Sequence, residues 1–147
     1  MLNAFHSPQS VALIGATSEI GQSILKALPQ DNLETCFIVA RDPKRGAKSL
    51  AEILPSKTKL TKVSFHAEKT QSQHGIVDQL FADGDLDIAI IAIGVLGKNP
   101  DLDQAANALE VMKVNYVASA HLMLLIAERM KLQGHGQIEI ISSFAQT

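Results

Sequence analysis

The sequence predicts an α/β fold: a doubly wound parallel sheet of five strands in the order 3-2-1-4-5, with helices on both faces. Short apolar runs alternate with stretches whose apolar residues recur at helical spacing, and the connections between them are short. Residues 86–93 are apolar almost throughout, as in a central strand that helices cover on both faces. The pattern stops after the fifth strand, so we expect a sheet truncated at that point.

The first two strand-and-helix units are the most regular. An apolar run at 11–16 ends beside a glycine, and apolar residues at helical spacing follow it as far as Pro29. A second apolar run at 35–40 precedes a helical stripe that Pro55 closes. Each unit is therefore predicted to be a strand, a turn and a helix.

The rest of the chain continues this alternation. Residues 59–66 alternate like a third strand, and residues 76–81 form the apolar stripe of a third helix. The pattern then predicts a long helix from about 102 to 132, which Gly134 closes in a left-handed conformation. Residues 137–141 begin the fifth strand.

The turn after the first strand, GATSEIG, predicts a site for a dinucleotide. Gly15 lets the backbone approach a pyrophosphate, and Gly21 permits close packing of the helix on the sheet. The amides at the start of the helix and the helix dipole favour an anion. An ordinary turn between a strand and a helix is the alternative.

Composition narrows the class of protein. The net charge of −2 and the absence of a basic surface pattern argue against a nucleic-acid partner. Cys36 lies in an apolar run and predicts a buried thiol, which is compatible with a reducing, cytoplasmic location. No signal peptide and no run of the roughly 18–20 apolar residues of a membrane span is evident. The histidines have no metal-ligand spacing, so we predict no metal, and without a linker residues 1–147 are predicted to form one domain.

Four segments resemble, in order and at suitable intervals, motifs of the short-chain dehydrogenases/reductases. GATSEIG resembles the TGxxxGIG turn, AIGVLG at 92–97 the NNAG segment, and VNY at 114–116 the asparagine motif of the fourth helix. GHGQIEIISS at 134–143 resembles the strand that carries the catalytic serine. The resemblance implies a Rossmann fold that binds NAD(P) and an oxidoreductase that transfers a hydride to a ketone.

Within this family, three segments look closest to the decaprenylphospho-β-D-erythro-pentofuranosid-2-ulose 2-reductase group of actinobacterial cell-wall synthesis. They are GATSEIG, GDLDIAIIAIGVLG and LLIAERMKLQGHGQI. This resemblance implies a sugar-2-ulose as substrate, either a small molecule or a lipid-linked sugar. The family associates through its fourth helix, and residues 116–127 are apolar on nearly all sides, so we expect a homo-oligomer.

The resemblance also implies roles for single residues. Asn115 corresponds to the asparagine that organises a water in the proton relay, and Ser143 to the hydroxyl that holds the substrate carbonyl, with Ser142 as the neighbouring candidate. Each of these side chains has an alternative role in binding the local backbone. The cofactor-binding positions that the resemblance implies are Gly15, Thr17, Ser18, Glu19, Ile20, Gly21, Arg41, His66, Ala67, Ala92 and Gly94.

Three departures from the family pattern affect the cofactor site. Glu19 replaces the second glycine of the turn, and its carboxylate has to point outward because it would otherwise repel a pyrophosphate. His66 followed by Ala67 stands where the family has an aspartate that faces the adenine. Ile91 and Ala92 replace two asparagines, so their side-chain hydrogen bonds are lost.

The region after the second strand favours NADP, with NAD as the alternative. Arg41 stands where the family uses arginine to meet the 2′-phosphate of NADP, and Ala40 stands where an acid would hold the ribose of NAD. Residues 41–62 hold seven of the 13 Lys and Arg against two acids, an excess that suits a phosphate. Asp42 keeps NAD possible.

The YxxxK motif of the family does not occur in the 147 residues. The sole tyrosine, Tyr116, precedes Ala120 by four positions where a lysine would be required. An acid that protonates the product alkoxide contributes roughly 10²–10⁴ in rate, so we expect an N-terminal fragment with little activity of its own. A non-catalytic nucleotide-binding or interaction module and an inert truncated product are the alternatives.

Overall fold

The computed structural model describes residues 7–97 and 104–142 of the chain. One parallel sheet of five strands has the order β3-β2-β1-β4-β5, which confirms the predicted fold class and strand order. Each strand overlaps its predicted range. The strands are β1 (Ser10–Ile14), β2 (Thr35–Ala40), β3 (Lys59–Ser64), β4 (Ile88–Ile91) and β5 (Gln137–Ile140).

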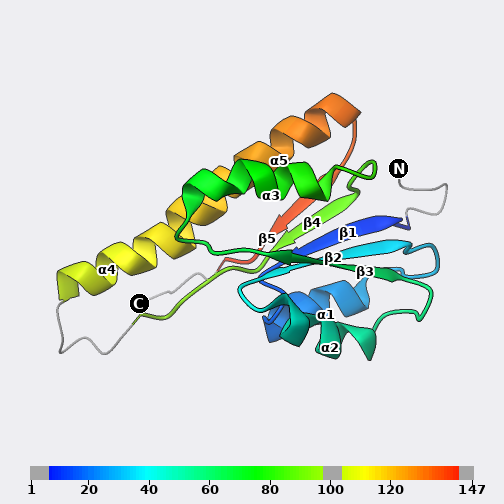
Figure 1. The fold of residues 1–147 in the computed structure, drawn as a ribbon, viewed down its shortest axis with the longest axis horizontal. Helices are drawn as coiled ribbons and strands as arrows, with labels where there is room; N and C mark the ends of the chain where they lie inside the picture. Colours follow the sequence, from blue (N-terminus) through cyan, green and yellow to red (C-terminus); the bar gives the residue numbers. More distant parts are fainter. Residues whose placement is uncertain (1–6, 98–103, 143–147) are drawn as a thin grey trace.

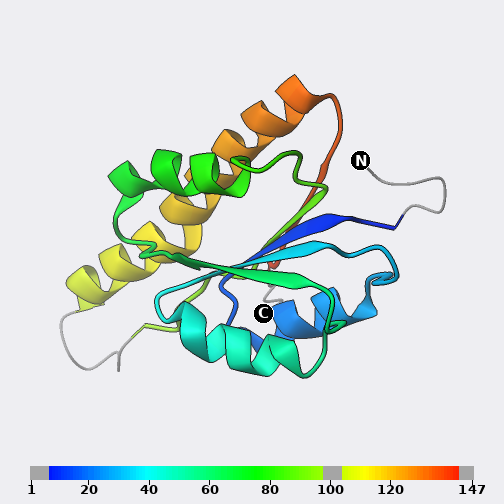
Figure 2. The same ribbon diagram turned by 45° about the vertical axis from the view of Figure 1, so that its right-hand side comes forward.

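Helices form a layer on each face of the sheet (Figure 1). The helices α1 (Glu19–Ala27) and α2 (Pro43–Ala51) lie on one face. The helices α3 (Gln73–Leu80) and α5 (Ser119–Gln133) lie on the other face, and Figure 2 shows the same two layers from a second direction. A short 3₁₀ turn, η1 (Thr70–Ser72), leads into α3.

The strand pleat divides the apolar side chains between two cores. On β1, Val11 and Leu13 pack toward α1 and α2, whereas Ala12 and Ile14 pack toward α3 and α5. All four side chains are fully buried. Because both faces are covered, the central strands are continuous apolar runs rather than alternating ones.

The helix ends follow the capping signals of the sequence. Asp42 caps α2, because its carboxylate accepts hydrogen bonds from the backbone amides of Lys44 and Arg45, and Pro43 occupies the first helical position. Gly134 closes α5 with φ 85°, which confirms the predicted left-handed residue. These caps fix the lengths of the connections on both faces.

The predicted long helix is continuous but not uniform. A π-helical segment, η2 (Lys113–Ala118), separates α4 (Gln104–Met112) from α5. Apolar spacing does not reveal such a segment, because one wider turn changes the helical period only locally. In Figure 1, α4 extends past the edge of the sheet, so the wider turn lies where the helix leaves the core.

The long helix meets a criterion for a membrane span, although the sequence was not expected to contain such a span. Its 29 residues, Ala105–Gln133, are long and apolar enough to cross a membrane, with a mean hydropathy of 1.3 over a window of which 33% is buried. The sequence has no uninterrupted apolar run of that length, but a mean over the window tolerates a few polar residues. A helix that covers the core of a soluble protein meets the same criterion.

Candidate functional site

A cavity of about 940 Å³ opens at the carboxyl edge of the sheet. In parallel sheets of this kind, ligands bind outside the carboxyl ends of the strands, at the point where the strand order reverses. Here β1 and β4 flank that point, and the segments that follow both strands line the cavity. Eight of the predicted cofactor-binding residues line it, namely Gly15, Thr17, Ser18, Ile20, Arg41, Ala67, Ala92 and Gly94.

Both glycines of the turn stand where a Cβ atom would overlap neighbouring atoms. Gly15 has φ +88°, and a Cβ atom there would overlap the carbonyl oxygen of Ala92. A Cβ atom at Gly21 would lie 2.9 Å from both the Cβ of Ala92 and the Cδ1 of Leu13. Gly15 therefore forms the cavity wall, whereas Gly21 lets α1 pack against β1 and β4 and does not itself line the cavity.

The start of α1 borders the cavity without a carboxylate facing it. Ser18 caps the helix, because its Oγ accepts a hydrogen bond of 3.2 Å from the amide of Gly21. Glu19 is exposed and is not among the residues that line the cavity. Its side chain therefore has the outward position that the sequence argument requires. The positive end of the helix dipole is left free to act on an anion.

The segment after β3 agrees only in part with the cofactor-binding positions that the resemblance to the family implies. Ala67 lines the cavity, but His66 does not, and its Nδ1 lies 3.4 Å from the Oε1 of Glu68. Glu68 and Phe65 line the cavity instead. Neither residue was predicted, because the resemblance marked only His66 and Ala67 in this segment. The alternation of β3 continues past its end at Ser64, so that Phe65 and Ala67 are buried and His66 is more exposed.

Asn115 reaches the cavity from the π-helical segment. Its Oδ1 accepts a hydrogen bond of 2.8 Å from the amide of Val95, and its Nδ2 donates one of 2.9 Å to the carbonyl of Val95. Both residues line the cavity. The side chain therefore joins the helix to the segment after β4, which is the backbone-binding role that the sequence left as the alternative. A role in a proton relay stays a prediction.

The carboxyl end of β5 reaches the same cavity. Ile141 and Ser142 line it, and the amide of Ile141 donates a hydrogen bond of 3.0 Å to the carbonyl of Ile91 on β4. Ser143, the predicted catalytic serine, lies outside the described residues. The neighbouring candidate, Ser142, thus stands at the cavity, and the role of Ser143 stays a prediction.

The basic residues of segment 41–62 are more dispersed than the sequence argument assumed. Arg41 lines the cavity at the end of β2, and it is the only one of the seven Lys and Arg of this fully described segment that does so. Lys57 donates to the carbonyl of Asp31, and Lys59 lies 3.5 Å from Asp83, both at the amino edge of the sheet. Much of the local charge excess therefore lies away from any phosphate in the cavity.

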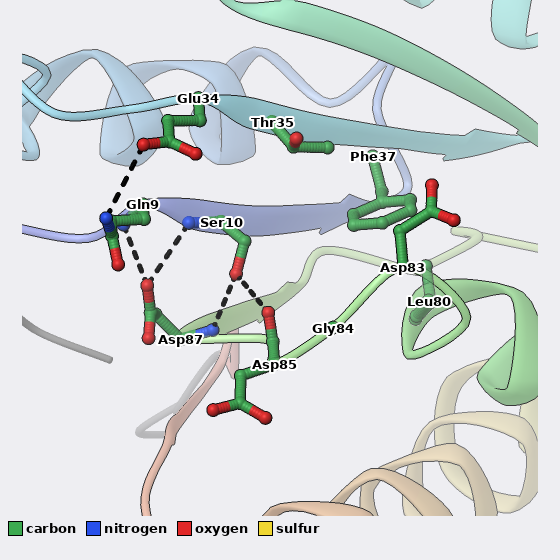
Figure 3. A pocket seen from close by; sticks show the side chains of 10 residues that line it. All are labelled: Gln9, Ser10, Glu34, Thr35, Phe37, Leu80, Asp83, Gly84, Asp85 and Asp87. Carbon is green, nitrogen blue, oxygen red and sulfur yellow. Dashed lines mark hydrogen bonds between the residues drawn. The ribbon is translucent and has the colours of Figure 1, made fainter.

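A smaller cavity of about 520 Å³ lies at the opposite, amino edge of the sheet. Figure 3 shows the carboxyl groups of Glu34, Asp83, Asp85 and Asp87 around it. Burial by itself raises the pKa of Asp87, but the hydrogen bonds that its carboxylate accepts hold this pKa below the usual value. The carboxylate therefore serves the fold here.

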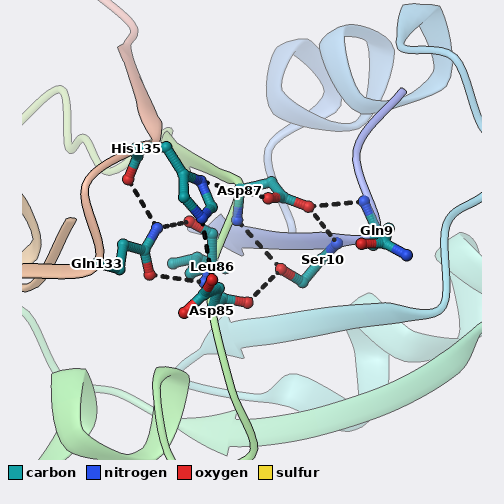
Figure 4. A network of polar contacts seen from close by, with 7 residues as sticks. All are labelled: Gln9, Ser10, Asp85, Leu86, Asp87, Gln133 and His135. Carbon is teal, nitrogen blue, oxygen red and sulfur yellow. Dashed lines mark hydrogen bonds and ion pairs between the residues drawn. The ribbon is translucent and has the colours of Figure 1, made fainter. Parts of the chain in front are cut away.

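A network of polar contacts includes two of these carboxyl groups, those of Asp85 and Asp87 (Figure 4). The amides of Gln9 and Ser10 donate to Oδ2 of Asp87 over 2.7 and 3.2 Å, which joins the start of β1 to the start of β4. Gln133, at the end of α5, exchanges two hydrogen bonds with the backbone of Leu86. His135 contacts Asp85 at 2.9 Å and Asp87 at 3.7 Å. The amino edge is thus built as a connected polar joint.

Two other sequence predictions concern metals and the thiol. Within residues 7–97 and 104–142, no three His, Cys, Asp or Glu side chains are grouped so that they could hold a metal ion. Cys36 is fully buried, which confirms the prediction for this residue, and burial raises its pKa to about 12. Its thiol is therefore protonated and inert near neutral pH.

Comparison with known proteins identifies the family. A family profile described as short chain dehydrogenase matches residues 9–147. The chain belongs to the short-chain dehydrogenase family. This assignment makes it an oxidoreductase by family, in agreement with the motifs of the sequence and with the cavity at the carboxyl edge of the sheet.

Curated relatives of this short-chain dehydrogenase include two oxidoreductases described as uncharacterised. The protein from Streptomyces coelicolor is 27% identical over 139 residues, which cover 94% of this chain and 55% of the relative. The protein from Mycobacterium tuberculosis strain H37Rv is 26% identical over 138 residues, which cover 92% and 55%. The chain therefore spans about half the length of the curated relatives that it matches.

Solved structures confirm the fold. A gluconate 5-dehydrogenase from Burkholderia cenocepacia in complex with NADP and tartrate has a TM-score of 0.76 at 18% identity, over 95% of this chain and 57% of that one. An actinorhodin polyketide ketoreductase with NADPH has a TM-score of 0.74 at 23% identity, over 92% and 53%. In both comparisons, this chain covers little more than half of the solved chain. At these identities, the likeness concerns the fold alone.

Proposed function

We propose that residues 1–147 form a single dinucleotide-binding domain of a short-chain oxidoreductase that uses NADP(H). The complete protein would transfer a hydride between this cofactor and a ketone or sugar-2-ulose. The observation that carries the proposal is the cavity in which Gly15, the start of α1 and Arg41 meet at the carboxyl edge of the sheet.

The residues of the cavity fit a dinucleotide. Gly15 provides backbone without a Cβ atom where a side chain would overlap Ala92, so a pyrophosphate can approach closely. The start of α1 would hold its negative charge through backbone amides, and Glu19 is directed away. Glu68, at the cavity wall, supplies an acceptor for an amino group of the adenine.

The preference for NADP over NAD rests on two residues. Arg41 lines the cavity and would meet the 2′-phosphate with a guanidinium group, whose donors match phosphate geometry. Asp42, which kept NAD possible, caps α2 with its carboxylate and does not line the cavity. Among the solved structures with this fold, the ketoreductase and the gluconate 5-dehydrogenase hold NADPH and NADP.

The reacting end of the cavity lies between β4 and β5. The nicotinamide would supply or accept the hydride there, Ser143 would hold the substrate carbonyl, and Asn115 would order a water in the proton relay. The family tyrosine and lysine would come from the part of the protein that this chain does not span. We propose the sugar-2-ulose class, free or lipid-linked, on the resemblance of three segments to reductases of such sugars, and a cytoplasmic location, which the buried thiol of Cys36 suits.

A second copy of the chain is the proposed partner of the long helix. Leu109, Met112, Tyr116 and Leu124 are each at least half exposed, so this helix presents a row of apolar side chains. A dimer would bury them. Sedimentation of the chain and of a Tyr116→Glu variant would measure this: a monomer in both would end the proposal.

The binding proposal is tested by thermal unfolding of the 147-residue chain with NADPH and with NADH. A ligand present at about 100 times its Kd stabilises the folded state by about 2.7 kcal/mol, which gives a shift of several degrees. We expect a larger shift with NADPH than with NADH. The absence of a shift with either cofactor would remove the binding proposal for this chain.

A further inference from the structure

We propose that Gln73 is a positioning residue for Asn115. It is the first residue of α3, does not line the cavity, and donates a hydrogen bond from its side chain to the last residue of the π-helical segment. The inference rests on the proposed function of the cavity, because Asn115 belongs to the wall of that cavity. It assigns a role to a residue that no motif of the sequence singles out.

Gln73 is a buried polar residue whose side-chain amide contacts the long helix through both its nitrogen and its oxygen. Its exposed fraction is 0%. Its Nε2 donates a hydrogen bond of 3.2 Å to the carbonyl of Ala118, and its Oε1 lies 2.6 Å from Nδ1 of His121. Burying an amide is costly unless its partners are present, so these contacts define one position of the helix relative to α3.

The orientation of this amide follows from its partners. The carbonyl of Ala118 can only accept a hydrogen bond, so Nε2 has to face it, and Oε1 is left to face His121. Nδ1 of His121 must then carry a proton and donate it. The ring of His74 packs edge-to-face on His121, with centroids 5.8 Å apart, and holds this ring in place. Gln73 therefore cannot turn its amide without losing both bonds.

The π-helical segment is held by contacts with two other parts of the chain. Asn115 binds the backbone of Val95 on the side of the cavity, and Ala118 receives the amide of Gln73 on the side of α3. Wide turns of this kind are rare and are frequently found at functional sites. Ala118 follows Asn115 by three positions, so the two contacts act on the same turn. If the contact on the side of α3 is lost, the turn can tighten and withdraw Asn115 from Val95.

The test is hydrogen exchange at the amide of Val95, which reports the contact with Asn115 directly and needs no cofactor. In Gln73→Met, which retains the bulk of the side chain but no donor, we expect this amide to exchange at least about tenfold faster. Gln79→Met is the matched control, because Gln79 lies on the same helix, is exposed, and donates only to the carbonyl of Gly75. We expect wild-type exchange at Val95 in this control.

The pattern of exchange separates positioning from simple destabilisation. A change that is largest at Val95 and at the side-chain amide of Asn115 supports the proposal. Equal acceleration across β1, β2 and β4, or unchanged exchange at Val95, overturns it. In Gln73→Glu the acceptor for His121 is kept and the donor to Ala118 is lost, so Val95 should again exchange faster.

A measurement on the unaltered chain covers the case in which these variants fail to fold. The side-chain amides of Gln73 and Asn115 and the backbone amide of Val95 should then become exchangeable in one common opening, with equal dependence on denaturant. Independent openings would overturn the proposal. Because all these readouts are made without NADPH, a failure of cofactor binding leaves the result for Gln73 interpretable.

Discussion

The two edges of the sheet use polar groups in opposite ways. At the amino edge, Asp87 is fully buried, accepts hydrogen bonds from the start of β1, and forms part of a network that extends to α5 and β5. At the carboxyl edge, the chain instead leaves a cavity of about 940 Å³, with Arg41 and Glu68 at its wall. At the amino edge the polar groups stabilise the fold by bonding to one another. At the carboxyl edge the charged side chains line a cavity that a ligand can enter.

This contrast suggests that stability and binding are largely separable in the molecule. Changes at the amino edge should lower the free energy of unfolding and leave the affinity of the folded chain for NADPH unchanged. Changes at the carboxyl edge should mainly alter that affinity. Four substitutions, taken from the largest expected effect to the smallest, test the separation.

The largest effect is expected for Asp87→Ala at the amino edge. The change leaves the partly buried amides of Gln9 and Ser10 without their acceptor, and an unsatisfied group of this kind costs up to about 1–3 kcal/mol. The free energy of unfolding in urea should therefore fall by about 2–5 kcal/mol. Asp83→Ala is the control, because its exposed carboxylate borders the same cavity and its ion pair with Lys59 is worth less than about 1 kcal/mol.

The same residue predicts how stability depends on pH. Because the pKa of Asp87 in the folded chain lies below its ordinary value, the carboxylate contributes stability that is fully present above the ordinary pKa near 3.8. This contribution is lost as the pH falls through the lower pKa of the folded state. In Asp87→Asn the loss of stability on acidification should be smaller than in the wild type; an unchanged acid profile would count against this assignment.

The second effect concerns the glycine turn at the carboxyl edge. Gly15→Ala places a Cβ atom against the carbonyl of Ala92 at a positive φ, a backbone strain of about 1–3 kcal/mol. The overlap would displace the turn that faces the pyrophosphate, so the Kd for NADPH should rise by roughly tenfold, a loss of about 1.4 kcal/mol of binding free energy. Gly75→Ala is the matched control, because Gly75 lies in α3 with open space around it, and there alanine should bind NADPH normally and favour the helix. Equal binding by the two variants would contradict the role of Gly15.

The third effect distinguishes the two cofactors. Arg41→Ala should raise the Kd for NADPH by about tenfold and leave the Kd for NADH nearly unchanged, because only NADPH carries the 2′-phosphate that a guanidinium binds. Lys59→Ala removes one positive charge at the opposite edge and serves as the control for net charge. Titration of both cofactors at one ionic strength makes the comparison. A similar loss for NADPH and NADH would show that Arg41 does not read the 2′-phosphate.

The sequence predicts the polar network at the amino edge of the sheet less well than the cavity at the carboxyl edge. The carboxyl edge follows from local signals: Gly15 comes directly after an apolar strand, and Arg41 directly after the next. Parallel strands bring such positions together, so a residue's place at the end of a strand is enough. The strand order follows in the same way from the alternation of elements and from right-handed crossovers.

The features that the sequence did not predict depend on contacts between distant segments. Asp87 directly precedes the apolar strand β4, and the amides that bond to its carboxylate belong to residues 77 and 78 positions earlier, so no local pattern marks its role. Glu68 follows β3 in a connection that no motif of the sequence marks, and the cavity that it lines is formed mainly by other segments. Gln73 is one of several polar residues around the start of α3, and only the packed structure shows that it is buried.

The smallest effect is expected for Glu19→Gln, at the start of α1, beside the cavity of the carboxyl edge but outside its lining. Glu19 lies in the first turn of α1, where a negative charge stabilises the helix dipole by about 0.3–1 kcal/mol, so its removal should lower stability by this amount. Glu52→Gln is the matched control, because Glu52 is at the opposite end of a helix, α2, where removal of a negative charge should raise stability slightly.

The affinity of Glu19→Gln for NADPH shows whether the carboxylate of Glu19 affects cofactor binding. Its side chain is exposed and does not line the cavity, so its charge should be screened by solvent and salt. We expect the Kd of Glu19→Gln to stay within about twofold of the wild type at physiological salt. A tenfold gain in affinity would mean that the carboxylate opposes the pyrophosphate. The departure from the family glycine would then weaken the site.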